Sequence, residues 1–168
     1  MSIIDTVTSI FSKQTIPDGV KAIENFNAKK YLGTWYEVAR IDFKYEKNLN
    51  NTTATYSLNK DGSIKVINRG YNYKTNTYKK SEGKAVFVKE KNVGMLKVSF
   101  FGPFYDGYNI LAIDDAYTHA LVCGRNHDYL WLLCRQPNMY EAIRDRYLKI
   151  ATDNGFDINR LLWVIHDQ

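Results

Sequence analysis

Eight short runs of alternating apolar and polar residues, spread between positions 34 and 135, most constrain the fold of this 168-residue chain. Short runs with a period of two are typical of half-buried β-strands. Segments with Gly, Asn or Asp separate several of the runs, and the pair Asp61-Gly62 is a strong hairpin signal. The predicted strands cover positions 34–43, 53–59, 63–71, 79–88, 94–101, 107–114, 119–124 and 128–135.

The segments between these runs are too short for the helical crossovers that a parallel sheet requires. We therefore predict an all-β, antiparallel fold, either a sandwich or an up-and-down barrel. One clear helix follows the last run. Its predicted N-cap is Asn138, its apolar face includes Ile143 and Tyr147, and Gly155 lies just past its end. We expect this face to pack on the outside of the sheet, and positions 161–165 to form a final strand.

The first 24 residues carry weak signals and are interpreted as an N-terminal arm, with a short helix over positions 5–12. Residues 25–168 are predicted to form the single domain. The arm lacks the charged start, long apolar core and cleavage site of a signal peptide. The first cysteine is Cys123, so we find no anchoring lipobox cysteine near the start, and no run reaches the roughly 18 apolar residues of a membrane span.

The charge pattern and the reactive side chains argue against several functions. The net charge is +5, but the basic residues are scattered rather than gathered in a stripe, so no nucleic-acid partner is expected. Cys123 and Cys134 lie too far apart along neighbouring strands for a disulfide, and both are predicted to point outwards. The three histidines are dispersed, so we expect neither a metal nor a cofactor. Without an inward nucleophile, we expect no enzymatic activity.

Alternation along each strand assigns its side chains to an inner and an outer face. One face combines the polar residues Glu37, Asn68 and Arg135 with large apolar ones. A filled core excludes such groups unless they find partners, whereas a barrel that holds a ligand tolerates them. Glu37 and Asn68 either anchor the polar part of a ligand or bind structural water. The predicted cavity-lining residues are Glu37, Ala39, Ile41, Tyr56, Asn68, Phe87, Val98, Tyr129 and Trp131.

Three short motifs carry a family resemblance. Gly33-x-Trp35 before the first long strand, Asp114-Asp115 after the sixth and Arg135 at the end of the eighth resemble the signatures of the lipocalin family. Segments such as NFNAKKYLGTWYEVARID and LKVSFFGPFYDGYNILAID are similar to the bacterial lipocalin and apolipoprotein D-like branch. The resemblance covers roughly residues 25–166. It implies an eight-stranded antiparallel up-and-down barrel with one C-terminal helix packed outside and a short final strand.

The resemblance also implies a structural plug at one end of the barrel. Gly33 allows a tight entry into the first strand, and the guanidinium of Arg135 is expected to cover the ring of Trp35. The loops after the first, third, fifth and seventh strands then surround the open end. Aromatic residues and cations alternate in these loops. The predicted mouth residues are Phe43, Tyr45, Tyr73, Phe101, Phe104 and Tyr105.

The function implied by the resemblance is that of a non-enzymatic lipid carrier. We expect a fatty acid or lysophospholipid to be bound, stored or transported in the barrel for membrane lipid maintenance. The exposed aromatic residues of the mouth are candidates for contact with a membrane surface or with a second copy in a homodimer. Two alternatives stay open: an enzyme acting on a bound small hydrophobe, and a carrier of haem or pigment.

The resemblance and the N-terminal sequence disagree about localisation. The branch is usually anchored in the outer membrane as a lipoprotein. Because positions 1–24 show neither a signal peptide nor a lipobox cysteine, we expect a soluble protein. It would be cytoplasmic, or periplasmic after removal of an export signal.

Overall fold

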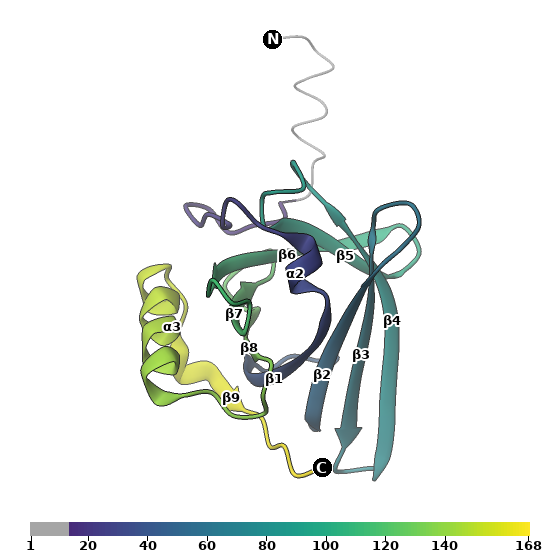
Figure 1. The fold of residues 1–168 in the computed structure, drawn as a ribbon. Helices are drawn as coiled ribbons and strands as arrows, with labels where there is room; N and C mark the ends of the chain where they lie inside the picture. The colour runs from purple at the N-terminus through teal and green to yellow at the C-terminus, as the bar shows by residue number, and fades with distance from the viewer. Residues whose placement is uncertain (1–13) are drawn as a thin grey trace.

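The computed structural model describes residues 14–168 and shows a closed antiparallel barrel with a helix packed against its outside (Figure 1). The helix expected over positions 5–12 lies outside the described residues. Strand β1 pairs with both β2 and β8, which closes the barrel. The eight barrel strands are β1 (Gly33–Ile41), β2 (Leu49–Leu58), β3 (Ile64–Asn72), β4 (Thr77–Phe87), β5 (Met95–Phe101), β6 (Phe104–Ile113), β7 (His119–Cys123) and β8 (Leu130–Cys134). The predicted up-and-down barrel is confirmed.

Side-chain oxygens of aspartates stabilise the turns that the sequence predicted. Between β2 and β3, Asp61 accepts a hydrogen bond from the backbone N–H of Ser63 at 2.9 Å, and Gly62 adopts φ +85°. Between β6 and β7, Asp114 accepts from the backbone N–H groups of Thr118 at 2.7 Å and of His119 at 2.8 Å. These local bonds connect consecutive strands tightly enough to form an antiparallel meander.

The C-terminal segment covers one side of the barrel with helix α3 (Glu141–Asp153), the 3₁₀ turn η1 (Ile158–Arg160) and strand β9 (Leu161–Trp163). The predicted N-cap is wrong: the cap is Tyr140, without a side-chain hydrogen bond, two residues after Asn138. Gly155 follows the cap residue Asn154 with φ +86°, which confirms the predicted helix end. The final strand is also confirmed, although it is shorter than predicted.

Strand β1 changes partners along its length. Its first four residues pair with β2. Its last three residues, which no longer pair with β2, pair along the same edge with β9. In between, the register with β8 shifts between Glu37 and Ala39, so that Val38 is the extra residue of a β-bulge. Beyond this bulge the inner and outer faces exchange parity.

Two apolar clusters follow from this arrangement. The inner cluster fills the closed end of the barrel around Trp35, Tyr56 and Leu96. The outer cluster lies between the barrel and α3, and its members include Cys123 and Cys134, both buried and unpaired as the sequence predicted. Helix α3 therefore stabilises the barrel from outside and leaves the interior accessible.

The outer cluster also contains Ala39 and Ile41, so their predicted position inside the barrel is wrong. The alternation that assigned them to the inner face does not continue through the bulge at Val38. Arg40, which alternation placed outside, points inwards instead and is fully buried.

A short helix closes one end of the barrel. Helix α2 (Ala28–Tyr31) precedes β1, and the side chain of Asn27 caps it by accepting from the N–H of Lys30. Upstream, Ile23 donates its N–H to Ile110 at 2.9 Å and accepts from Gly94 at 2.9 Å. The chain before α2 is thus attached to β6 and to the segment before β5, and the domain boundary at residue 24 stays a prediction. No helix within residues 14–168 has the length and apolar character needed to cross a membrane.

The packing under α3 gives a stability prediction. Ala151 is fully buried against the barrel, so Ala151→Leu is expected to overpack this contact and lower the free energy of unfolding by about 1–3 kcal/mol. The matched control Ala142→Leu, on the exposed face of the same helix, is expected to change it by less than about 0.5 kcal/mol. Urea denaturation measures both, and equal losses would contradict the packing described.

Candidate functional site

The barrel encloses a cavity of about 660 Å³, a size typical of small-molecule sites. All eight barrel strands contribute to its walls, and Phe26 and Tyr31 contribute from the closed end. Its other end is surrounded by residues of the β1–β2 and β7–β8 connections, among them Tyr45 and Arg125, and by Phe104 at the start of β6. The cavity therefore opens opposite α2.

The closed end is held by the guanidinium of Arg135. It lies 3.9 Å from the ring centroid of Trp35, which is fully buried, in the contact that the sequence predicted. The indole N–H of Trp35 donates to the backbone oxygen of Tyr31 at 2.8 Å. The guanidinium also donates to the backbone oxygens of Lys30, Tyr31, Leu32, Thr34 and Tyr117, at 2.9–3.3 Å.

Gly33 is required for this closure on two grounds. It adopts φ +98°, which residues with a Cβ rarely adopt. A Cβ at this position would also lie 3.2 Å from a guanidinium nitrogen of Arg135. The motif Gly33-x-Trp35 therefore serves to close the barrel, and it does not identify a ligand.

Most of the predicted lining residues surround the cavity. They are Glu37, Tyr56, Asn68, Val98, Tyr129 and Trp131. Ala39 and Ile41 lie outside the barrel, as described above. Phe87 points inwards but packs at the closed end, with its ring 6.2 Å from that of Phe26, and it is not part of the cavity wall. Whether the residues of the wall contact a ligand stays a prediction.

A cluster of charged groups lies in the wall near the mouth. The fully buried guanidinium of Arg40 donates to Glu37 at 3.2 Å and to Asp42 at 2.8 Å, and a third carboxylate, that of Glu46, lies 3.7 Å away. Glu46 also accepts from the indole N–H of Trp131 at 2.9 Å. Burial, and then the neighbouring Glu46, raises the pKa of Glu37 well above its ordinary value despite the opposing effect of Arg40.

This cluster combines predicted and unpredicted residues. Glu37 and Glu46 line the cavity, whereas Arg40 supports them from behind. Alternation missed Arg40 because of the bulge at Val38, and no sequence signal marked that bulge. The side chains of Tyr31 and Tyr108 were also missed, although both line the cavity. Tyr31 comes before the first strand, where alternation gives no information.

Aromatic residues and cations gather at the mouth. The ring of Phe43 lies 5.6 Å from that of Tyr129 and 5.8 Å from that of Trp131, and Arg125 lies 5.1 Å above the Tyr129 ring. Arg125 is also paired with Asp106. Further cations that line the cavity are Arg69, Lys79 and Lys80.

The predicted mouth residues separate into two groups. Five of them line the cavity: Phe43, Tyr45, Phe101, Phe104 and Tyr105. Phe101 and Phe104, at the tip of the β5–β6 hairpin, are 72% and 76% exposed. Tyr73 lies away from the cavity on the β3–β4 turn, where its hydroxyl donates to Asn48 at 3.4 Å.

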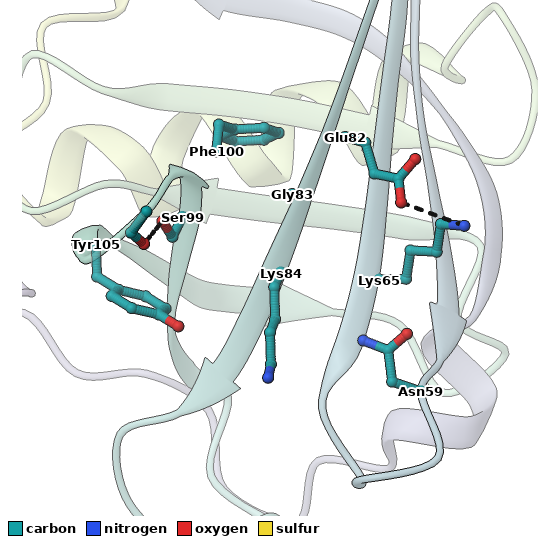
Figure 2. A pocket seen from close by; sticks show the side chains of 9 residues that line it. Asn59, Lys65, Glu82, Gly83, Lys84, Ser99, Phe100 and Tyr105 are labelled. Atoms are coloured by element: carbon teal, nitrogen blue, oxygen red, sulfur yellow. Dashed lines mark hydrogen bonds and ion pairs between the residues drawn. The ribbon is translucent and has the colours of Figure 1, made fainter.

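A second, open recess of about 420 Å³ lies on the outer face of strands β3 to β5 (Figure 2). Figure 2 shows Lys65 paired with Glu82, at 3.3 Å. The other lysine of this recess, Lys84, is paired with Asp61 at 2.9 Å. Because both of its lysines are already paired with carboxylates, we assign no function to this recess.

Comparison with known proteins gives matches over most of the chain. The family model described as a lipocalin-like domain matches residues 26–166. The outer membrane lipoprotein Blc of Citrobacter freundii is 50% identical over 169 residues, covering 98% of this chain and 96% of the relative. Apolipoprotein D of Rattus norvegicus is 37% identical over 147 residues, covering 82% and 76%. The solved structure of insecticyanin from the tobacco hornworm Manduca sexta matches with a TM-score of 0.74 at 19% identity, covering 91% and 87%.

These relatives correct the expected localisation. Similar proteins from Citrobacter freundii, Escherichia coli and Vibrio cholerae are each named an outer membrane lipoprotein, at 45–51% identity. The expectation of a soluble cytoplasmic or periplasmic protein is therefore wrong. It depended on the absence of a recognisable signal in the first 24 residues, and the similarity to these named relatives outweighs that argument.

The plug gives a second stability prediction. We expect Arg135→Lys to lower the free energy of unfolding by about 2 kcal/mol or more, because an ammonium has too few donors for five carbonyl oxygens and stacks less well on Trp35. The control is Arg160→Lys, which alters an exposed pair with Asp128 and should cost less than about 0.5 kcal/mol. Thermal or urea denaturation compares the two, and similar losses would show that Arg135 does not hold the plug.

The raised pKa of Glu37 predicts a pH dependence of stability. In the folded protein Glu37 keeps its proton at pH values where the unfolded chain has lost it, so its contribution to stability falls as pH rises above the ordinary glutamate value of about 4.3. The fall ends where Glu37 ionises in the folded state. Glutamine does not ionise, so we expect Glu37→Gln to remove this pH-dependent loss of stability. The free energy of unfolding of the variant should then increase relative to that of the wild type as pH rises.

Urea denaturation from about pH 5 to about pH 8 measures this difference. The control Glu82→Gln alters a carboxylate that is half exposed beside Lys65, and its stability should follow the wild-type pH profile. Parallel profiles for Glu37→Gln and the wild type would contradict the raised pKa.

Proposed function

This chain belongs to the lipocalin family, whose members bind small hydrophobic ligands, and we propose that its own ligand is a single-chain lipid, a fatty acid or a lysophospholipid. The observation that carries the proposal is the distribution of polarity along the cavity. Its inner part is walled by apolar side chains such as Val66, Leu96 and Val98, while its cations are at the mouth. An acyl chain placed along this gradient gains about 0.8 kcal/mol for each buried methylene group.

The mouth supports an anionic head group. Arg69, Lys79 and Lys80 line the outer cavity, and carboxylate or phosphate oxygens form charge-assisted hydrogen bonds with such groups. Arg125, beside them, is already paired with Asp106. Glu37 and Asn68 lie deeper, where they either contact the polar part of the ligand or hold water. We propose that Tyr129 and Trp131 cover the first methylene groups of the chain.

The positions of the thiols support a carrier without enzymatic activity. Cys123 and Cys134 belong to the cluster under α3, outside the barrel. Burial raises the pKa of Cys123 to about 12, so its nucleophilic thiolate is scarce at neutral pH. An enzyme acting on a bound hydrophobe would need a nucleophile that reaches the cavity.

The β5–β6 hairpin supports exchange of lipid at a surface. Phe101 and Phe104 expose most of their rings beside the mouth. We propose that they contact a membrane surface while lipid passes in or out, in a role in membrane lipid maintenance, which agrees with the names of the bacterial relatives. The same rings would be covered in a homodimer, which is the alternative.

Native mass spectrometry of the purified protein, followed by lipid extraction, tests the proposal. We expect a mass increase that disappears on delipidation, and recovery of an acyl-chain lipid. Titration of the delipidated protein with a lysophospholipid should then give a dissociation constant in the micromolar range or below, on the order of that expected from burial of a long chain. A visible absorption band would favour a haem or pigment instead, and failure of a lysophospholipid and a fatty acid to bind would overturn the proposal.

The role of the hairpin gives a specific prediction. Phe104→Asp places a charge beside the mouth, so we expect it to slow transfer of a fluorescent lipid from anionic vesicles at least about fivefold. Because Phe104 is already exposed, the melting temperature should change little. Tyr140→Asp is a matched control, since Tyr140 is 78% exposed but lies at the start of α3. Equal effects of both variants on transfer would contradict the role of Phe104.

A further inference from the structure

Three phenol hydroxyls meet at the closed end of the cavity. They belong to Tyr31 on α2, Tyr56 on β2 and Tyr108 on β6, and we call them the phenol triad. The hydroxyl of Tyr108 is hydrogen-bonded to that of Tyr31 and lies 2.7 Å from that of Tyr56. All three residues line the cavity, and Tyr31 and Tyr56 are only 2% and 5% exposed.

The plug fixes the triad in place. The ring of Tyr31 lies 5.0 Å from that of Trp35 and 5.1 Å from that of Tyr56, and the ring of Tyr56 lies 6.0 Å from that of Tyr108. The backbone oxygen of Tyr31 accepts hydrogen bonds from both Trp35 and Arg135. The triad is therefore a rigid part of the cavity floor, fixed by the same contacts that close the barrel.

The surroundings of the triad are apolar, since Ile64, Val66 and Leu96 also line this end of the cavity. Burying a hydroxyl in such a place is unfavourable unless it is hydrogen-bonded, and phenylalanine would fill nearly the same volume without a polar atom. An unsubstituted acyl chain that reached the floor would gain nothing from these hydroxyls. A polar group that reached the floor could instead pair with the lone pairs that these hydroxyls leave unused.

The hydrogen-bonding capacity of the triad selects the kind of group. Each phenol has one donor and two acceptor lone pairs. Even if all three donors are used within the triad, three lone pairs remain. A ligand hydroxyl can donate to one of them and accept from a phenol whose O–H rotates.

Other oxygen groups fit the triad less well. A ketone only accepts, so it can use one phenol O–H but leaves the other lone pairs of the triad without a donor, whereas a hydroxyl both donates and accepts. A carboxylate would bring a charge into the apolar end, at a large desolvation penalty. Burial raises the pKa of all three phenols, which keeps them neutral and able to donate.

We propose that the phenol triad is a second polar subsite, at the closed end, which binds the hydroxyl group of a hydroxylated acyl chain. The hydroxyl would lie at or near the end of the chain remote from its carboxylate. This inference rests on the proposed function, because the acidic head occupies the cationic mouth while the hydroxyl reaches the floor. The ligand class is thus a hydroxy fatty acid, or a lysophospholipid that carries one.

Paired ligands test the subsite. Each saturated fatty acid from dodecanoic to octadecanoic acid is compared with its terminally hydroxylated counterpart on the delipidated protein, by displacement of a fluorescent fatty acid. A terminal hydroxyl buried without a partner should weaken binding about tenfold or more. At the chain length that reaches the triad, we expect the hydroxy acid to bind at least as tightly as its parent acid.

Tyr108→Phe removes the central hydroxyl of the triad. At the matching chain length it should weaken binding of the hydroxy acid about tenfold, while the parent acid changes by less than about twofold. Tyr147→Phe is the matched control, because it removes a buried phenol that donates to the backbone of His119 outside the barrel. It should change neither affinity. If Tyr108→Phe does not fold, Tyr56→Phe provides the same comparison.

Two outcomes would overturn the inference, and they differ in what they imply. In the first outcome, the parent acids bind, every hydroxy acid binds more weakly than its parent, and Tyr108→Phe leaves the ratio of the two affinities unchanged. The subsite then does not exist, while the carrier function stands. If neither series binds at any chain length, the proposed function fails and the inference fails with it.

Discussion

The contact between Arg135 and Trp35 determines which end of this barrel is closed. One guanidinium covers the indole ring and donates to five backbone oxygens, four of them within residues 30–34 and one at Tyr117. It thereby connects β8, α2, the start of β1 and the β6–β7 turn. Because Tyr31 is held in the same network, the contact that closes the barrel also positions the hydroxyls of its floor. Loss of Arg135 would therefore affect the shape of the cavity as well as its stability.

The bulge at Val38 has a comparable influence on the chemistry of the wall. Without the extra residue, Ala39 and Ile41 would face the cavity and Arg40 would face outwards. With it, the two apolar side chains complete the cluster under α3, and Arg40 comes to lie behind Glu37 and Glu46. A single irregularity in one strand thus replaces an apolar stretch of wall with a buried ionic cluster, in which Arg40 opposes the rise in pKa that burial and Glu46 cause at Glu37.

The cavity that results is polar at both ends and apolar between them. Cations and aromatic rings surround the mouth, and three phenols lie on the floor. Each end obtains its polarity from a different source. The cations and aromatic rings of the mouth lie mainly on or beside the loops between strands, so their presence there follows from the local sequence. The three phenols of the floor come from α2, β2 and β6 and meet only when the barrel closes. This arrangement suits an elongated amphipathic ligand with its charged head among the cations of the mouth.

The sequence by itself determined the eight strands, their antiparallel arrangement and the outer helix, because alternation, helical spacing and turn residues act over a few neighbouring positions. The closed barrel and the plug were expected from the resemblance of its short motifs to the lipocalin family, and alternation placed six of the nine predicted lining residues on the cavity wall. Only the tertiary structure decided three features: the inward position of Arg40, the packing of Phe87 at the closed end outside the cavity wall, and the hydrogen bonds among Tyr31, Tyr56 and Tyr108. The physical reason is that a bulge interrupts alternation without a sequence signal, and that hydroxyls distant in the chain become neighbours only through strand pairing.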